Sequence, residues 1–560
     1  MSVKANTSGP APWGTMAIDM LAIASFWGVS LAIVNPIGDF PLNDDWSYGL
    51  TVKHLIEKGD FRPMGWTSMP LITHALWGSL FCIPAGFSFN ALRLSTLTMS
   101  LLGVLGAYLL IMNVCQSRWV AAMVALTLGF NPIYYSLSNT FMTDVPYAAI
   151  TILASVLFVR CLRTDSNLAF LTGTTLAVAA TLSRQLGISI PLAFAVSMIL
   201  RRGIAARNIG RAAIPAALCV GALWGFQHWL SATGRLPALY YAQTDQLLHM
   251  LADPGTLIRN FAHGTYIVLL YMGWFLSPIL LLAWAGVWVC HKKKLIAVLT
   301  ALVGVMVVRG EVRVLHGSSP LMPVSSNIID KGGIGPFTLP DTAILNCPLP
   351  ALPPVFWLVM TTVSLAGAAL LITALGMGAI DVAQRARLSR MNDSEAAGIF
   401  FLLSAMIYLL PLVVDGFLDR YLLPLIPLLA GSIASISSHF PRITARGSRF
   451  AAVMLLGPFL FFSICGTRDY LEWNRVRWKG LNDLMESKQV KAEDIDGGLE
   501  FNGLYDPMSV GWVRGDNYLI AFRPVPGYIL IKEYNYRHWM PRYAGKVVVL
   551  QKNPLEAPKR

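Results

Sequence analysis

Residues 351–378 read ALPPVFWLVMTTVSLAGAALLITALGMG, a run that contains no charged side chain. A transmembrane helix needs about 20 predominantly apolar residues, so this run is long enough to cross a bilayer. Similar runs recur along the chain, and they are continuous rather than alternating, which argues against a transmembrane barrel. The sequence therefore predicts an α-helical, polytopic membrane protein.

The composition agrees with this class, because 55% of the 560 residues are hydrophobic and only 13% are charged. We predict about thirteen spans, each near the length that a bilayer requires. Their approximate ranges are 14–34, 91–112, 119–137, 145–162, 168–183, 187–201, 211–229, 264–290, 295–309, 351–378, 398–414, 421–438 and 450–467. The N-terminus lacks the cleavage site of a signal peptide, so we expect the first span to be a retained anchor.

The net charge of +13 is concentrated in short loops between the predicted spans. Loops rich in arginine and lysine face the cytoplasm, so this charge indicates topology rather than nucleic-acid binding. An odd number of spans then predicts a cytoplasmic N-terminus and an extracytoplasmic C-terminus. The basic positions are Arg160, Arg163, Arg201, Arg202, Arg207, Arg211, Lys292, Lys293, Lys294, Arg385, Arg387, Arg390, Arg442, Arg446 and Arg449.

We predict two domains, a transmembrane domain over residues 1–467 and an extracytoplasmic domain over residues 468–560, where charged residues become frequent. The first outer loop covers 35–90. Within it, Val52–Lys58 is a predicted short helix, and Pro70–Pro84 is an apolar stretch that is too short to span and is expected in the membrane interface. Further outer loops are predicted at 230–262 and 310–350, and the latter is irregular because it is rich in Gly, Pro and Ser.

The C-terminal segment combines strand-forming runs with turn residues, which predicts a small mixed α/β domain. The runs are Tyr518–Phe522, Tyr528–Lys532 and Lys546–Gln551, and the turns lie at Gly497-Gly498 and Pro524–Gly527. Acceptor recognition and a simple folded cap over the site are both open roles for this domain. The seven cysteines show no metal-binding spacing, and we expect no disulfide framework.

Two acidic motifs stand next to predicted spans, where charge is costly and is usually kept for function. The first is Asn43-Asp44-Asp45-Trp46-Ser47-Tyr48, which follows the first span. Its carboxylates could accept a proton from a nucleophile or could hold a metal ion. Capping of the helix that carries Tyr48 is an alternative for one of the two acids, but not for both.

The second motif is Asp144-Val145-Pro146, at the start of a later span on the same predicted side as Asp44. Helix capping is again the alternative to a functional role, because Pro146 is suited to a first helical turn.

Two arginines on that side have the planar fork that binds phosphate oxygens. Arg420 belongs to the run Asp419-Arg420-Tyr421-Leu422-Leu423-Pro424, and Arg184 lies in a short outer turn. The alternatives are an ion pair of Arg420 with Asp415 or Asp419, and an Arg184 side chain that snorkels to the interface.

These residues, in this order, resemble the bacterial members of the dolichyl-phosphate-mannose protein mannosyltransferase family. This is a GT-C glycosyltransferase group related to the lipid A aminoarabinose transferase. The likeness is best over about residues 36–165 and in the arginine run. The residues that match are Asp44-Asp45 with Tyr48, Gly59-Asp60, Met69-Pro70-Leu71, Arg93, Asp144-Val145-Pro146 and Arg420-Tyr421-Leu422-Leu423-Pro424.

The resemblance implies a GT-C transferase that uses a polyprenyl-phosphate sugar and inverts the anomeric centre. Asp44 would be the catalytic base or would orient the acceptor, with Asp45 and Asp144 in support. Asp44 and Asp144 would also be the ligands of a divalent ion, Mg²⁺ or Mn²⁺, if the enzyme uses one. Arg420 and Arg184, with Tyr421, would bind the donor phosphate.

The resemblance also implies substrate contacts from four further side chains: Tyr48, Arg62, His74 and Arg93. Relatives of the lipid A type often have Glu-Lys-Pro-Pro where this chain has Ser68-Met69-Pro70-Leu71, a departure that argues against a lipid A acceptor. His54, His74 or Arg62 could replace the missing acid and lysine.

The leading hypothesis is therefore a multi-pass transferase of a bacterial inner membrane, with its C-terminal domain in the periplasm. Its partners would be the polyprenyl-phosphate donor, membrane lipid, and an envelope glycan, lipid or protein acceptor. A transporter or a flippase for lipid-linked sugars is the chief alternative, although such proteins usually have internal repeats and charges near the midplane. A non-catalytic assembly subunit is a third hypothesis.

Overall fold

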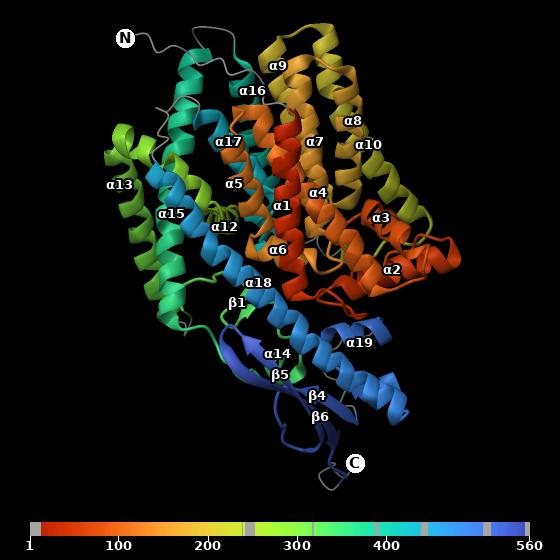
Figure 1. Ribbon diagram of the computed structural model, residues 1–560. Helices are drawn as coiled ribbons and strands as arrows, with labels where there is room; N and C mark the ends of the chain where they lie inside the picture. The colour runs from red at the N-terminus through yellow and green to blue at the C-terminus, as the bar shows by residue number, and fades with distance from the viewer. Residues whose placement is uncertain are drawn as a thin grey trace.

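The structure is a computed structural model that describes residues 13–237, 239–240, 253–315, 319–386, 391–437, 446–507 and 517–554. Long helices form a bundle, and a small sheet lies at one end of it (Figure 1). Parts of the predicted loops 230–262 and 310–350 lie outside the described residues, as do the basic positions Arg387, Arg390 and Arg442.

The first half of the chain forms most of the bundle. Its helices are α1 (Trp13–Val34), α2 (Asp45–Lys58), α3 (Ile72–Cys82), α4 (Phe89–Cys115), α5 (Arg118–Gly129), α6 (Pro132–Ser138), α7 (Asp144–Thr164), α8 (Asn167–Ser183), η1 (Gln185–Ile188), α9 (Ser189–Arg202) and α10 (Ala206–Ala232).

The second half completes the bundle and adds the extramembrane part. Its helices are α12 (Pro254–Phe275), α13 (Ser277–Leu315), α14 (Pro340–Ala343), α15 (Pro354–Ala386), α16 (Asp393–Asp415), η2 (Asp419–Leu422), α17 (Leu425–Ser437), α18 (Arg446–Asn482), η3 (Asp483–Ser487), η4 (Ala492–Asp494) and α19 (Leu499–Tyr505). The strands are β1 (Ile329–Asp330), β2 (Gly333–Ile334), β3 (Ile495–Asp496), β4 (Tyr518–Ala521), β5 (Tyr528–Trp539) and β6 (Arg542–Lys552).

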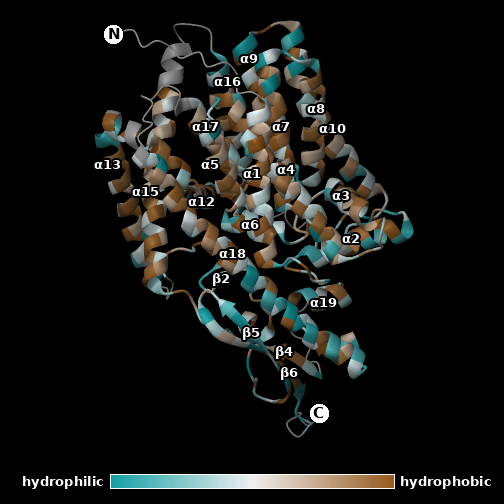
Figure 2. Ribbon diagram, viewed as in Figure 1, coloured by the Kyte–Doolittle hydropathy of each residue, from teal (hydrophilic) through white to brown (hydrophobic). Residues whose placement is uncertain are grey.

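The bundle confirms a multi-pass helical membrane protein. Among the described residues, eight helices are long and apolar enough to cross a membrane, or up to ten if each of two bent pairs is one span. Hydrophobic residues cover these helices, whereas the sheet end is largely hydrophilic (Figure 2). The predicted number of about thirteen is larger because it included segments that form short helices, such as α8 with 17 residues, α9 with 14 and α17 with 13.

Two predicted spans are bent rather than straight. Residues 119–137 form α5 and α6, which meet at 63°. Asn131 caps the new helix and Pro132 occupies its first turn, a combination that starts helices. The predicted span 264–290 is interrupted at Leu276, where α12 and the start of α13 meet at 79°. At the predicted loop after it, two helical segments of α13 meet across a kink at His291.

The first outer loop folds at the same end of the bundle as the sheet, as Figure 1 shows. The helix predicted at Val52–Lys58 begins earlier, at Asp45, and ends at Gly59 with a left-handed φ of 64°. The apolar stretch predicted in the interface forms α3. The sheet end, the first outer loop and the start of α7 are therefore neighbours, although the sequence separates them widely.

The predicted C-terminal domain is confirmed as a mixed α/β unit. Its sheet has the strand order β3-β4-β6-β5, in which β3 and β4 are parallel and the other pairs are antiparallel. The predicted domain boundary at 467–468 lies inside α18, a helix of 37 residues that passes without a break from the bundle to the sheet. One helix of roughly 55 Å thus connects the two parts.

Glycines permit a close crossing of α12 and α15. A Cβ atom at Gly367 would overlap the Gly273 carbonyl, and one at Gly273 would overlap the Ser364 carbonyl. The two backbones therefore touch where a side chain would hold them apart, a packing typical of helices in membranes.

We expect Gly367→Leu to lower the stability of the bundle, since overpacking of this kind costs about 1–3 kcal/mol or more. Gly376→Leu on the same helix is the matched control, because a Cβ there has open space around it. Thermal unfolding in detergent should give a lower midpoint for the first variant only. Equal midpoints would contradict the tight crossing.

Candidate active site

Five predicted side chains meet at the sheet end of the bundle, and we call them the acid–arginine cluster: Asp44, Asp144, Arg184, Arg420 and Tyr421. Arg420 Nη2 lies 2.9 Å from Asp44 Oδ2, and Arg184 forms an ion pair with Asp144. The guanidinium carbons of Arg184 and Arg420 lie 4.6 and 5.6 Å from the centre of the Tyr421 ring. The structure therefore brings these predicted residues together at one end of the bundle.

The Asp44 carboxylate is used for contacts across the site rather than for its own helix. Asp44 is the N-cap residue of α2, but its side chain makes no capping hydrogen bond. Its Oδ1 instead accepts a hydrogen bond of 3.1 Å from the indole of Trp66. The Asp44 side chain is 14% exposed, so it is held in place and can still be reached from outside the fold.

Asp45 has the opposite environment. Its two oxygens accept backbone N–H groups of Leu42 at 2.5 Å and Phe141 at 3.0 Å, and the residue is buried. Burial raises the pKa of this carboxyl to about 7, against the lowering effect of the two amides. We predicted Asp45 among the catalytic residues, in support of Asp44; in the structure its carboxylate joins the first outer loop to the segment before α7.

The cluster and the residues beside it contain buried polar atoms that have no hydrogen-bond partner. They include Nε and Nη1 of Arg420, Oδ2 of Asp144, the Tyr147 hydroxyl and Nδ1 of His74. Buried polar groups are nearly always satisfied, so each such atom needs an explanation. Both donors and acceptors are present among them, and a polar ligand with phosphate and hydroxyl groups would satisfy both kinds.

Two of the predicted substrate contacts, Tyr48 and His74, lie beside the cluster. Their rings meet edge to face at 6.4 Å, and His74 stacks on Phe141 at 4.0 Å. Both residues are buried. Burial, the largest effect, and the nearby Asp44 carboxylate raise the pKa of the Tyr48 hydroxyl, so it stays neutral.

The other two predicted contacts, Arg93 and Arg62, are placed differently. Arg93 is buried and donates to the carbonyl groups of Pro36, Gly38 and Phe40. Its guanidinium is therefore used to shape the first outer loop, which corrects the predicted substrate role. Arg62 is exposed, and no hydrogen bond joins it to the cluster in the part of the chain that the structure describes.

Trp66 and Asp419 are site neighbours that the sequence did not single out for this position. An Asp419–Arg420 ion pair was a predicted alternative, but Arg420 pairs with Asp44. The Asp419 carboxylate instead accepts hydrogen bonds from the backbone N–H groups of Asn327, Ile328 and Ile329. Asp419 thereby ties the β1–β2 segment to the arginine run. No local pattern in the sequence could indicate partners so far along the chain.

Within the described ranges there is no group of three or more His, Cys, Asp or Glu side chains that could hold a metal ion. The two predicted ligands, Asp44 and Asp144, each face an arginine. A divalent ion at either carboxylate would have to compete with a guanidinium for the oxygen atoms.

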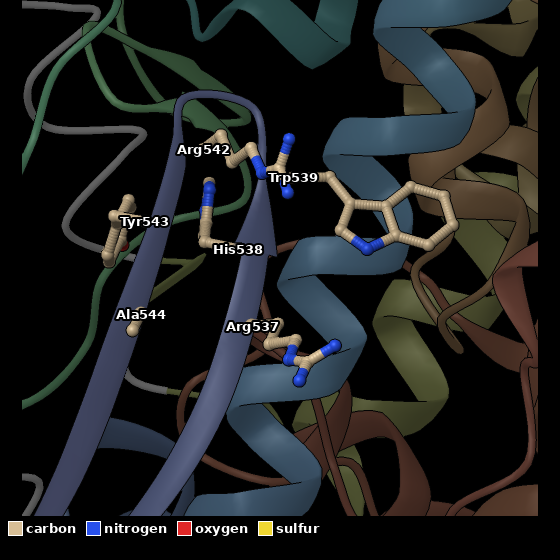
Figure 3. A pocket seen from close by; sticks show the side chains of 6 residues that line it. All are labelled: Arg537, His538, Trp539, Arg542, Tyr543 and Ala544. Atoms are coloured by element: carbon tan, nitrogen blue, oxygen red, sulfur yellow. The ribbon is translucent and has the colours of Figure 1, made fainter.

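A recess of about 760 Å³ lies at the end of the β5–β6 hairpin, beside α18 (Figure 3). Its lining residues are Arg537, His538, Trp539, Arg542, Tyr543 and Ala544. Trp539 extends over α18, where the Arg468 guanidinium lies 4.5 Å from its ring. None of the predicted site residues lines this recess, so it is separate from the acid–arginine cluster.

Asp45 should make stability depend on pH. The pKa of the Asp45 carboxyl is about 7 in the fold and about 4 in the unfolded chain, so its protonated form adds to the free energy of unfolding. This contribution is full below pH 4 and is lost as the pH rises through 7. The native chain should therefore lose more thermal stability between pH 5 and pH 8 than Asp45→Asn, which cannot ionise. Parallel losses in both proteins would show that Asp45 does not titrate in this window.

No protein-family model and no curated protein matches this chain. Among solved structures it is similar to ArnT from Cupriavidus metallidurans in the apo state, with 14% sequence identity, a TM-score of 0.40, and coverage of 98% of this chain and 99% of that one. It is also similar to the same protein bound to undecaprenyl phosphate, with 14% identity, a TM-score of 0.39, and coverage of 98% and 100%.

Proposed function

We propose that this protein is a membrane glycosyltransferase that moves a sugar from a polyprenyl-phosphate donor to an acceptor. The observation that carries the proposal is the Asp44–Arg420 pair, in which a partly exposed carboxylate touches a buried guanidinium that keeps two donors without partners. A base and a phosphate-binding group are thus side by side at the end of the membrane spans.

Arg420 is suited to the phosphate of the donor. Its Nη2 is paired with Asp44, which leaves Nε and Nη1 buried and free of hydrogen bonds. These two donors lie on different edges of the guanidinium, so each can donate a separate charge-assisted hydrogen bond to a phosphate oxygen. Arg184, whose guanidinium also lies against the Tyr421 ring, supplies a second permanent positive charge.

Asp44 is suited to the acceptor. As an acceptor hydroxyl oxygen forms a bond to the anomeric carbon, its proton passes to the Asp44 carboxylate. The bond between that carbon and the phosphate oxygen breaks, and its electron pair leaves with the polyprenyl phosphate. Arg420 and Arg184 stabilise the charge that grows on the phosphate in the transition state. Attack opposite the leaving phosphate inverts the anomeric centre.

Tyr48 and His74 lie close enough to the cluster to contribute to the sugar site. Asp144 holds Arg184 and keeps its Oδ2 free for a hydroxyl group. In this proposal Asp45 and Arg93 position the loop that carries Asp44.

The cluster side of the membrane is extracytoplasmic, the N-terminus is cytoplasmic, and the membrane is a bacterial inner membrane. An envelope glycan, lipid or protein accepts the sugar.

A transporter or flippase for lipid-linked sugars is the second candidate, since it too would need buried charge to bind a phosphate. The location of the charges favours the transferase. Asp144 is the first residue of α7, and Asp44 and Arg420 belong to segments between spans, so the cluster lies at one end of the bundle rather than midway along its helices.

Asp44→Asn should abolish transfer, because the amide cannot accept the proton, while the variant should fold normally. The assay uses membranes that contain the protein and a set of defined polyprenyl-phosphate sugars, and it measures release of free polyprenyl phosphate. The matched control is Asp165→Asn, at the opposite end of α7, where Asp165 also pairs with an arginine, Arg211. Equal release by native chain and Asp44→Asn would remove Asp44 from the mechanism.

Chelation of divalent ions should leave transfer within about twofold of its normal rate. In this proposal arginines, not a metal ion, stabilise the leaving phosphate, because Asp44 and Asp144 each already form an ion pair with a guanidinium group. Transfer is compared in EDTA, in Mg²⁺ and in Mn²⁺. Loss of activity in EDTA with recovery in one of the metals would establish a metal-dependent enzyme and overturn this assignment.

A further inference from the structure

The C-terminal domain reaches the acid–arginine cluster through one buried side chain, Glu500 of α19. Glu500 Oε1 accepts the backbone N–H of Asn43 at 3.1 Å, across a sequence separation of 457 residues. Asn43 is buried and has a left-handed φ of 57°. The next residue is Asp44, so Glu500 holds the turn from which the Asp44 carboxylate projects.

Glu500 is itself fixed by a buried ion pair. Arg477, on the extramembrane part of α18, lies 2.7 Å from Glu500 Oε2, and both side chains are 0% exposed. Thr338 donates a hydrogen bond of 2.6 Å to the same oxygen, and Arg477 Nε donates to the Gly497 carbonyl at 2.9 Å. A buried carboxylate with all of these partners has little freedom to move.

The turn has a second support on the membrane side. Asp45 ties it to Leu42 and Phe141, as described above. Two buried carboxylates thus hold the four-residue turn 42–45: Glu500 of the C-terminal domain binds the Asn43 amide, and Asp45 binds the Leu42 amide. Of Asp44, Asp45 and Glu500, Asp44 is the acid that forms an ion pair with Arg420. The two supports define the direction in which the Asp44 side chain points.

Packing between α19 and α2 reinforces this link. The Trp46 side chain is completely buried and lies against Gly503, where a Cβ atom would overlap the indole ring. Glycine at 503 therefore lets α19 approach closely enough for Glu500 to reach Asn43.

We infer that Glu500 is a positioning residue for the proposed sugar transfer, which makes the C-terminal domain a structural part of the active site rather than only a cap over it. This inference rests on the proposed function only for its kinetic consequence. Its structural consequence, an ordered turn at Asn43–Asp44, can be measured separately.

The test compares two double variants that both remove the buried charges. Replacing a buried ion pair by apolar residues of similar volume is often tolerated. Glu500→Met with Arg477→Met removes the acceptor of the Asn43 amide. Glu500→Gln with Arg477→Met is the matched control, because the glutamine carbonyl can still accept that hydrogen bond. Gly503→Ala is a third variant, which displaces α19 but keeps both residues of the ion pair.

With a polyprenyl-phosphate sugar as donor, the Met/Met variant should lose about 10–100-fold in kcat, since small errors in position cost rates of this order. Its KM for the donor should stay within about threefold, because Arg420 and Arg184 are unchanged. The Gln/Met control should stay within a few-fold of the native kcat. Gly503→Ala should shift kcat in the same direction as the Met/Met variant.

Amide hydrogen exchange over residues 36–48 gives the independent readout. Exchange in this segment should be faster in the Met/Met variant and in Gly503→Ala than in the Gln/Met control. If all three variants match the native chain in exchange and in kcat, the positioning role is wrong. If the native chain transfers no sugar but exchange responds as expected, the proposed function fails while the link between Glu500 and the turn stands.

Discussion

The site depends on the pairing of buried charge at the edge of a membrane. A guanidinium in a low-dielectric region is costly unless a carboxylate and good hydrogen bonds compensate it. Arg420 and Arg184 each have such a partner, Asp44 and Asp144. The two pairs share the Tyr421 ring, so the five side chains form one unit whose geometry no single helix could set.

Most of the surrounding polar groups support this unit through the backbone. Arg93 binds three carbonyl groups of the first outer loop, Asp45 binds two amides, and Asp419 binds three amides of the β1–β2 segment. Such contacts fix loops that carry little regular structure. They explain how a cluster built from loop residues can be as well defined as one built on a helix face.

The chemistry proposed for the cluster follows from what these supports leave unused. The backbone occupies both oxygens of Asp45 and much of Arg93, whereas Arg420 keeps two free donors and Asp44 keeps contact with the exterior. A side chain that is fixed in place but still has unused hydrogen-bonding capacity is suited to binding a ligand. A phosphate matches the free donors of Arg420, and a hydroxyl group can reach the partly exposed Asp44 carboxylate.

The sequence by itself determined the helical membrane class and the α/β nature of the C-terminal segment, and it predicted the candidates Asp44, Asp144, Arg184 and Arg420, to which the family resemblance added Tyr421. Apolar length, turn residues and the cost of charge near a span are local properties, and local properties can be read in order along a chain. The three strand-forming runs after residue 517 show the same principle, since β4, β5 and β6 lie on them.

Only the tertiary structure decided which acid faces the site and which serves the fold. Asp44 and Asp45 are adjacent and chemically alike, yet one meets Arg420 and the other meets two backbone amides. The roles of Arg93, Trp66 and Glu500 also depend on partners distant in sequence, up to 457 residues in the case of Glu500 and Asn43. The physical reason is that hydrogen bonds act over about 3 Å in space, whatever the separation along the chain.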